Sequence, residues 1–337
     1  MARFERRCFG EERPLELPWA RLNGLHGGGL YPGLHVVVGG TGSGRSQFGL
    51  QAALHAARAG VITIYVALEL GHDDIAARVL GELAGLRWSD VLYGNYGDRA
   101  SAELARAAET LRRLPLTIDF GGPHRWDAST LRDEIAALAS ERGPGTASNI
   151  GASAFVVIDF LQIVGSHADT SFREPRDRIA RAAYAARELA RTGDVVVMAI
   201  SSVAREAYPI VGGDRIRSFV HKDGVLSDVH QLVGLGKECG EIEYAADSVT
   251  LVCSWADQLP EERAGEGSRE VIFAIPKLRA GPAGWTSLRF NGSRFADPAD
   301  GGERLWSSIA QKKLKAKEER ERKPKGRRKS ATAGLNT

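Results

Sequence analysis

The stretch VVVGGTGSGRSQF (Val36–Phe48) constrains the fold most, because three β-branched apolar residues lead into a glycine-rich turn and then into a helical pattern. Glycines let such a turn adopt backbone angles that a Cβ would forbid, so that successive N–H groups point at one anion. A helix that begins at the end of the turn adds its dipole and its unsatisfied amides. The stretch therefore predicts a phosphate cradle. Its expected residues are Gly39, Gly40, Thr41, Gly42, Ser43, Gly44, Arg45 and Ser46.

The spacing is that of the Walker A pattern, G-x-x-x-x-G-K-[ST], except that Arg45 stands at the lysine. Ser46 occupies the position whose hydroxyl coordinates Mg²⁺. A guanidinium can reach phosphate oxygens with two N–H groups, but it is bulkier than an ammonium group. The pattern therefore predicts a site for ATP and Mg²⁺ and leaves hydrolysis open.

Three later apolar runs each end in polar residues. VITIYVALEL ends near Glu69, AFVVID ends at Asp159, and DVVVMAISS ends at Ser201 and Ser202. The carboxyl ends of parallel strands are where open α/β sheets bind ligands. We expect Asp159 to hold Mg²⁺ in a Walker B pattern and Ser202 to sense the γ-phosphate. Glu69 is either the general base toward a water or a solvated residue that caps the next helix.

Strand and helix patterns alternate along the chain, which predicts an α/β fold with a mostly parallel, twisted sheet flanked by helices. The length of 337 residues and a hydrophobic content of 43% suit a single large domain of this kind. We expect an irregular lead-in at 1–30, the core at 31–298 and a disordered basic tail at 299–337. Residues 311–329 carry eleven Lys or Arg and three Glu, a net charge of +8. The whole chain carries only +3, so its basic character comes from this tail. The tail either contacts nucleic-acid phosphates or only solubilises the protein.

The compartment is expected to be the cytoplasm. The three cysteines, Cys8, Cys239 and Cys253, have no metal-binding spacing and no disulfide framework. No apolar run approaches the roughly 18 residues of a membrane span, so no membrane partner is expected. The N-terminus, MARFERRCFGEERP, lacks the apolar core of a signal peptide.

A long glycine-containing segment, 206–236, is too long for an ordinary connection in a compact domain. Basic residues on it suit nucleic-acid phosphates, although a solvated loop is an equal alternative. The candidate DNA contacts, here and at the start of the basic helix expected over 172–191, are Arg173, Arg176, Arg215, Arg217 and Lys222.

Several motifs in register resemble the RecA-like C-terminal ATPase domain of the DnaB-type replicative helicases. ALELGHDDIAARVL is similar to that family's SLEM…R-x-L segment, and VVIDFLQIV to its D-[YF]-L-Q signature. GLGKECGEIEYAADSV resembles LRESG-x-IE-x-DAD, and AIPKLRAGPAGWTSLRF resembles K-x-R-x-G-P-x-G with its closing strand. The resemblance covers about 15–297 and implies a RecA-like P-loop fold.

The resemblance also implies roles for individual residues. The catalytic set would be Glu69, Arg45, Lys277 and Arg279, with Lys277 and Arg279 matching the K-x-R pair that reaches a neighbouring subunit's nucleotide. Such fingers imply a homo-oligomeric ring, a hexamer by analogy, around single-stranded DNA, with replication or loader proteins as further partners. The implied function is ATP hydrolysis coupled to DNA translocation and unwinding.

Three departures from the family pattern matter: Arg45 replaces lysine, Ser202 replaces the glutamine of an S-Q motif, and no counterpart of the helical N-terminal domain is expected. The expected lack of the N-terminal domain argues against the housekeeping replicative helicase. Two alternatives remain: an oligomeric DNA-binding protein that binds ATP without efficient cleavage, and a regulatory ATPase of the RadA or KaiC type. Retention of Glu69 favours the enzyme, whereas Arg45 and Ser202 favour the binder.

Overall fold

The structure is a computed structural model. It describes residues 5, 8–9, 12–121, 128–142, 150–163, 175–203, 207–211, 214–221, 223–233, 235, 240–254 and 268–298. Two of the candidate DNA contacts, Arg173 and Lys222, lie outside these residues, as do Cys239 and the basic tail.

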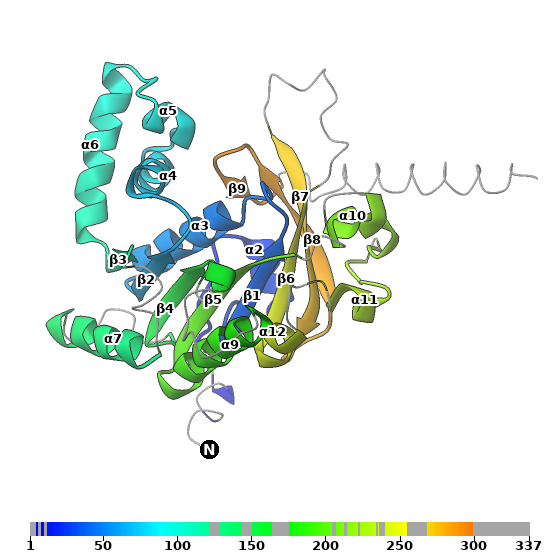
Figure 1. The fold of residues 1–337 in the computed structure, drawn as a ribbon. Coiled ribbons are helices and arrows are strands. Elements are labelled where there is room, and N and C mark those ends of the chain that lie inside the picture. Colours follow the sequence, from blue (N-terminus) through cyan, green and yellow to red (C-terminus); the bar gives the residue numbers. More distant parts are fainter. Residues whose placement is uncertain are drawn as a thin grey trace, which may run out of the picture.

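A single sheet organises the part of the chain that the structure describes, with nine strands in the order β3-β2-β4-β5-β1-β6-β7-β8-β9 (Figure 1). Their bounds are β1 Gly33–Gly39, β2 Ile62–Ala67, β3 Leu116–Asp119, β4 Ala154–Asp159, β5 Val195–Ser202, β6 Ser248–Ser254, β7 Arg269–Leu278, β8 Gly284–Phe290 and β9 Phe295–Ala296. The strands from β3 to β6 in this order pair in parallel, and β7, β8 and β9 pair antiparallel. The prediction of a mostly parallel sheet is confirmed.

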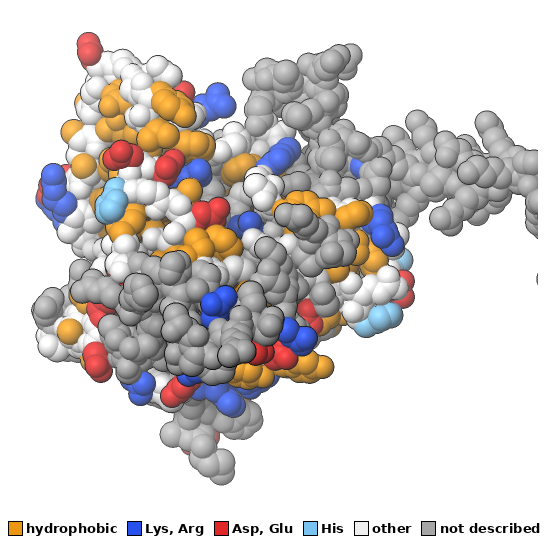
Figure 2. All heavy atoms as spheres, viewed as in Figure 1, with side chains coloured by type: hydrophobic (Ala, Val, Ile, Leu, Met, Phe, Trp, Pro, Cys, Tyr) orange, Lys and Arg blue, Asp and Glu red, His pale blue; other side chains and the backbone are white. Residues whose placement is uncertain are grey.

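The helices flank this sheet. They are α2 Ala20–Leu25, α3 Arg45–Arg58, α4 His72–Ala84, α5 Trp88–Leu92, α6 Asp98–Arg113, α7 Ala128–Arg142, α9 Pro175–Thr192, α10 Tyr208–Val211, the 3-10 helix η3 Asp214–Ser218, α11 Val229–Val233 and α12 Gly240–Ala245. Figure 1 shows α4, α5 and α6 standing out from the sheet at its β3 edge. Figure 2 shows hydrophobic side chains gathered over this lobe at the upper left.

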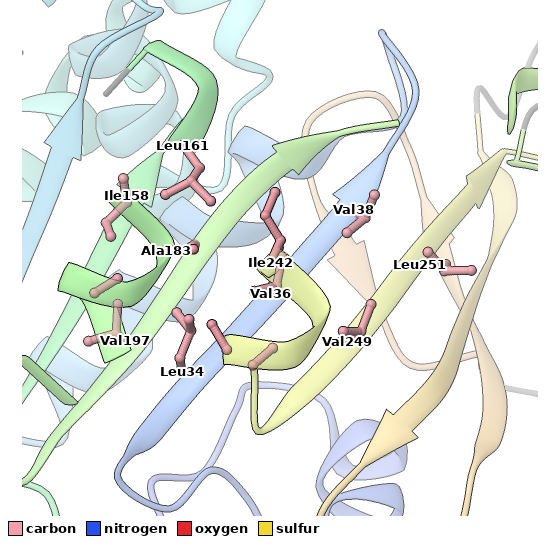
Figure 3. Close-up of a cluster of buried hydrophobic side chains, with 14 of the residues drawn as sticks. Leu34, Val36, Val38, Ile158, Leu161, Ala183, Val197, Ile242, Val249 and Leu251 are labelled. Atoms are coloured by element: carbon pink, nitrogen blue, oxygen red, sulfur yellow. The ribbon is translucent and has the colours of Figure 1, made fainter. Parts of the chain in front are cut away.

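The central strands are buried on both faces, which explains their continuous apolar sequences. Successive side chains of a strand point to opposite faces, so β1 sends Leu34, Val36 and Val38 into one hydrophobic cluster and Val37 into the other. Figure 3 shows the first cluster, in which Ala183 of α9 and Ile242 of α12 meet β1. The second cluster lies between the sheet and α3.

The segment before β1 is more ordered than we expected. It contains α2, and Leu15, Leu17 and Trp19 are each at most 5% exposed. The Trp19 ring stacks on Phe48 of α3 with the ring centroids 4.3 Å apart. The physical reason is visible in retrospect, because apolar residues at every second position are typical of an extended segment with one buried face.

No helix among the described residues is long and apolar enough to span a membrane.

Candidate nucleotide-binding site

The predicted cradle is the turn between β1, which ends at Gly39, and α3, which begins at Arg45. Gly42 and Gly44 have φ angles of +74° and +92°, in the left-handed region that favours glycine. A Cβ on Gly44 would lie 2.8 Å from Phe295 Cζ, so a side chain there is also excluded by packing. The 14-residue helix α3 therefore begins directly at the turn and presents its first amides to it.

Two side chains that the sequence did not indicate border the cradle. The hydroxyl of Tyr208, on α10, lies 3.2 Å from Thr41 Oγ1 and accepts a 3.5 Å hydrogen bond from the Thr41 amide. Arg269, the first residue of β7, donates from Nη2 to the Gly42 carbonyl at 2.7 Å. Neither residue belongs to a local motif, so only the tertiary fold could reveal them.

Arg45 is tied to the end of the neighbouring strand β5. Its Nη1 donates to the Ser201 carbonyl and, at 3.3 Å, to Ser202 Oγ. Burial lowers the pKa of the guanidinium, whereas the carboxylates of Asp159 and Glu69 act in the opposite direction. Four predicted site residues therefore lie together at the carboxyl edge of the sheet: Arg45, Glu69, Asp159 and Ser202.

Asp159 is the last residue of β4 and is 1% exposed. Its Oδ2 accepts a 2.6 Å hydrogen bond from Tyr65 Oη, and Oδ1 has no hydrogen-bond partner within the described residues. Burial raises the pKa of this carboxyl, and the hydroxyls of Tyr65 and Ser46 together with Arg45 lower it.

The pair Asp159 and Ser46 fits Mg²⁺. One carboxylate oxygen without a partner and a neighbouring hydroxyl are hard oxygen ligands, and Mg²⁺ is commonly held by one or two carboxylates plus waters and substrate phosphates. Among the residues described, no group of three His, Cys, Asp or Glu side chains forms an all-protein metal site. The substrate phosphates would thus supply further ligands.

Glu69 lies two residues beyond β2, and its side chain is partly exposed. Strand β2 pairs in parallel with β4, with Ala67 opposite Asp159, and the Leu68 amide donates to the Asp159 carbonyl at 2.8 Å. Partial burial and then the Asp159 charge raise the pKa of Glu69, and Arg45 lowers it. Glu69 and Asp159 thus follow neighbouring strands beside the cradle.

Gln162, in the DFLQ segment, links this edge together. Its Nε2 donates to Ser201 Oγ at 2.8 Å, and its Oε1 accepts from the Ser202 amide at 3.3 Å. It holds the end of β5, which in turn holds Arg45. Its signal in the sequence was its place three residues after Asp159.

The predicted finger pair lies far from the cradle of its own chain. Strand β7 runs antiparallel to β6, so it begins at the cradle edge with Arg269 and ends at the opposite edge. There Lys277 donates to the Glu243 carbonyl, and Arg279 bonds the Tyr244 carbonyl at 3.2 Å and the Asp247 carboxylate at 3.3 Å. Arg269 and Lys277 are eight residues apart on β7, and eight residues of strand span roughly 27 Å.

The candidate DNA contacts that the structure describes are not equivalent. Arg176 forms an ion pair with Glu241 at 3.3 Å, Arg215 is exposed on η3, and Arg217 is only 8% exposed. Arg176 and Arg215 are therefore exposed to solvent, whereas Arg217 is buried.

Comparison with known proteins places this geometry in a family. The family model described as "DnaB-like helicase C terminal domain" matches residues 18–297. The structure described as "ATPase Domain of G40P" superposes with a TM-score of 0.65 at 18% identity, covering 86% of this chain and 93% of that one. No curated protein matches the sequence.

A second solved structure is described as "The Structure Of A DnaB-Like Replicative Helicase And Its Interactions With Primase". It has a TM-score of 0.63 at 18% identity, covering 85% of this chain, which spans 63% of that protein's length. Likenesses at this identity establish the fold, and they confirm the predicted RecA-like core. Because the family model matches most of the chain, the chain belongs to the DnaB-like helicase C-terminal domain family.

Proposed function

We propose that the chain is an ATPase motor that binds ATP with Mg²⁺ and couples hydrolysis to movement along single-stranded DNA and to duplex unwinding. The observation that carries the proposal is the placement of Glu69 and Asp159 after neighbouring parallel strands, next to the turn that ends β1. A base, a metal-binding carboxylate and an anion cradle at one sheet edge are the parts that phosphoryl transfer to water requires.

The residues divide the work as follows. Amides of the 39–46 turn bind the phosphates, and Ser46 and Asp159 hold Mg²⁺. Glu69 orients a water and accepts its proton; its raised pKa makes it a stronger base than an ordinary surface glutamate. Bound MgATP supplies the phosphoryl group, whose charge Arg45 neutralises through N–H groups directed at phosphate oxygens.

The position of Lys277 and Arg279 supports action between subunits. Both lie at the sheet edge opposite the cradle of their own chain, where only a neighbouring copy could bring phosphates to them. A closed ring, a hexamer by family analogy, would satisfy this arrangement around a DNA strand. Within such a ring Arg215, exposed on η3, would contact the DNA strand. Replication and loader proteins remain proposed partners.

One observation favours a second function, nucleotide binding without efficient cleavage. Arg45 is engaged with Ser201 and Ser202 rather than projecting freely into the cradle. A cation that must be shared with the protein stabilises transition-state charge less than a free one. ATP would then act as a ligand that holds subunits together on DNA.

ATP hydrolysis with and without single-stranded DNA separates these functions. Wild type, Glu69→Gln and Arg45→Lys are compared, with Glu103→Gln on the exposed helix α6 as the matched control. The motor predicts DNA-stimulated turnover that falls about 10²-fold or more in Glu69→Gln only. Binding of ATP without turnover in wild type, with activity gained in Arg45→Lys, establishes the binder instead.

A further inference from the structure

Arg45, at the start of α3, and Ser202, at the end of β5, are in contact. Nη1 of Arg45 lies 3.3 Å from Ser202 Oγ and also donates to the Ser201 carbonyl. Gly39 of β1 stands opposite Ser202 in the parallel ladder, so the guanidinium crosses from the start of α3 to the end of the adjacent strand. The contact joins two separate segments of the cradle edge.

Small residues make room for this crossing. Arg45 Cδ lies 3.1 Å from the position that a Cβ would take on Gly39, so the arginine stem passes close over that glycine. The guanidinium then ends against Ser202, whose side chain has one heavy atom beyond Cβ. A glutamine has four, and its amide would compete with the guanidinium for the same space.

Ser202 cannot easily withdraw to accommodate a larger group. Its amide donates to Gln162 Oε1 at 3.3 Å, and its carbonyl accepts from Ser201 Oγ at 3.3 Å. Ser201 Oγ accepts a further hydrogen bond from Gln162 at 2.8 Å. The backbone at the end of β5 is therefore held in place, and the size of the side chain at 202 decides whether Arg45 can reach it.

The chemistry of arginine allows it to serve two sides at once. A guanidinium carries five N–H groups in a fixed fork, whereas a lysine has a single nitrogen on a shorter reach. The hydrogen bonds of Arg45 to described residues both start from Nη1. Nη2 and Nε make no hydrogen bond to the described residues, so their N–H groups remain available to phosphate oxygens while Nη1 keeps hold of β5.

We propose that Arg45 and Ser202 form one coupled pair: Ser202 makes room for the arginine, and Arg45 itself links the bound phosphates to the end of β5. This inference rests on the proposed nucleotide-binding function of the cradle, and it does not require that ATP be hydrolysed.

A double-mutant cycle on nucleotide affinity tests the pair. Affinity for Mg²⁺ with a fluorescent ATP analogue is measured for wild type, Arg45→Lys, Ser202→Gln and the double variant. We expect each single variant to bind about tenfold more weakly, and the double variant to return to within about threefold of wild type. Losses that simply multiply in the double variant overturn the coupling.

Further variants control for size, chemistry and folding. Ser202→Ala keeps the room but removes Oγ, so its affinity should stay within about threefold of wild type; a loss equal to that of Ser202→Gln contradicts the role of size. Arg58→Lys, at the exposed end of α3, and Ser101→Gln, exposed on α6, are matched controls. The unfolding temperatures of the same four proteins without nucleotide give a second double-mutant cycle, because Arg45 contacts Ser202 without a bound ligand.

The two proposals fail separately. Coupling in the affinity cycle without DNA-stimulated turnover supports the pair and refutes the motor. Turnover without coupling supports the motor and refutes the pair.

Discussion

Tyr65 of β2 donates a 2.6 Å hydrogen bond to Asp159 at the end of β4, across two paired parallel strands. The phenol ring is fully buried, and the bond fixes one oxygen of the carboxylate while leaving Oδ1 without a partner among the residues described. The relationship orients the proposed magnesium ligand from within the core.

Removing this hydroxyl should weaken both the fold and the metal site. In Tyr65→Phe the buried carboxylate loses a hydrogen bond, which costs about 1–3 kcal/mol. Because the Tyr65 bond lowers the pKa of Asp159, that pKa should also rise. Urea unfolding and the Mg²⁺ concentration needed for nucleotide binding report the two effects. Tyr184→Phe, on the exposed part of α9, is the control, and equal stability of the two variants would contradict the prediction.

Two glycines of the cradle should respond differently to alanine. Gly44→Ala meets both a φ of +92° and Phe295 Cζ at 2.8 Å, whereas Gly42→Ala meets a φ of +74° in open space. The conformational penalty of about 1–2 kcal/mol is common to both, and overpacking adds about 1–3 kcal/mol at Gly44 alone. Gly94, with a φ of +72° outside the cradle, provides the reference. Equal losses of unfolding free energy at 44 and 94 would refute the packing argument.

Stability should fall as the pH drops below about 6.5. Burial, and then the neighbouring His35, lower the pKa of His26 from 6.5 to about 3. A histidine whose folded pKa is depressed contributes stability above its unfolded pKa, and that contribution is lost as the pH falls toward the folded value. One such group accounts for about 2 kcal/mol between pH 6.5 and 5.

The pH dependence of unfolding in His26→Gln tests this. The slope of unfolding free energy against pH should decrease by close to one proton relative to wild type, and His35, whose pKa is lowered mainly by burial, should account for part of what remains. His230→Gln, exposed on α11, is the matched control. An unchanged slope in His26→Gln would show that this histidine binds protons equally in the folded and unfolded states, and would contradict the prediction.

Mixing variants should reveal whether Lys277 acts on a neighbour. Lys277→Ala retains its own Glu69, and Glu69→Gln retains Lys277, so a mixed ring contains interfaces with both groups intact. We expect each variant alone to be inactive in ATP hydrolysis and their mixture to recover part of the wild-type rate. The Glu69→Gln, Lys277→Ala double variant alone, in which every interface lacks both groups, gives the baseline rate. No recovery in rings of mixed composition would exclude action between subunits.

The sheet was predictable because its central strands are continuous apolar runs, such as β4 and β5, and the cradle because its glycines have a local pattern. The direction of the Arg45 side chain was not, since its partners lie 156 and 157 positions away and a long side chain has several rotamers. Tyr208 and Arg269 reach the cradle across 167 and 227 positions. Contacts set by tertiary packing leave no periodicity to detect. The DNA contacts stay a prediction, with Arg217 buried and Arg173 and Lys222 outside the described residues.

Strand β7 carries Arg269 at one end, against the cradle turn, and Lys277 at the other, near Asp247. Its middle is fully buried between β6 and β8, so it cannot bend without breaking hydrogen bonds to both neighbours. In a ring it would behave as a stiff rod with one end in each of two consecutive phosphate sites. A displacement of the turn at one site would then shift Lys277 at the next site. The order in which the sites of the ring hydrolyse ATP would follow from the stiffness of this one strand.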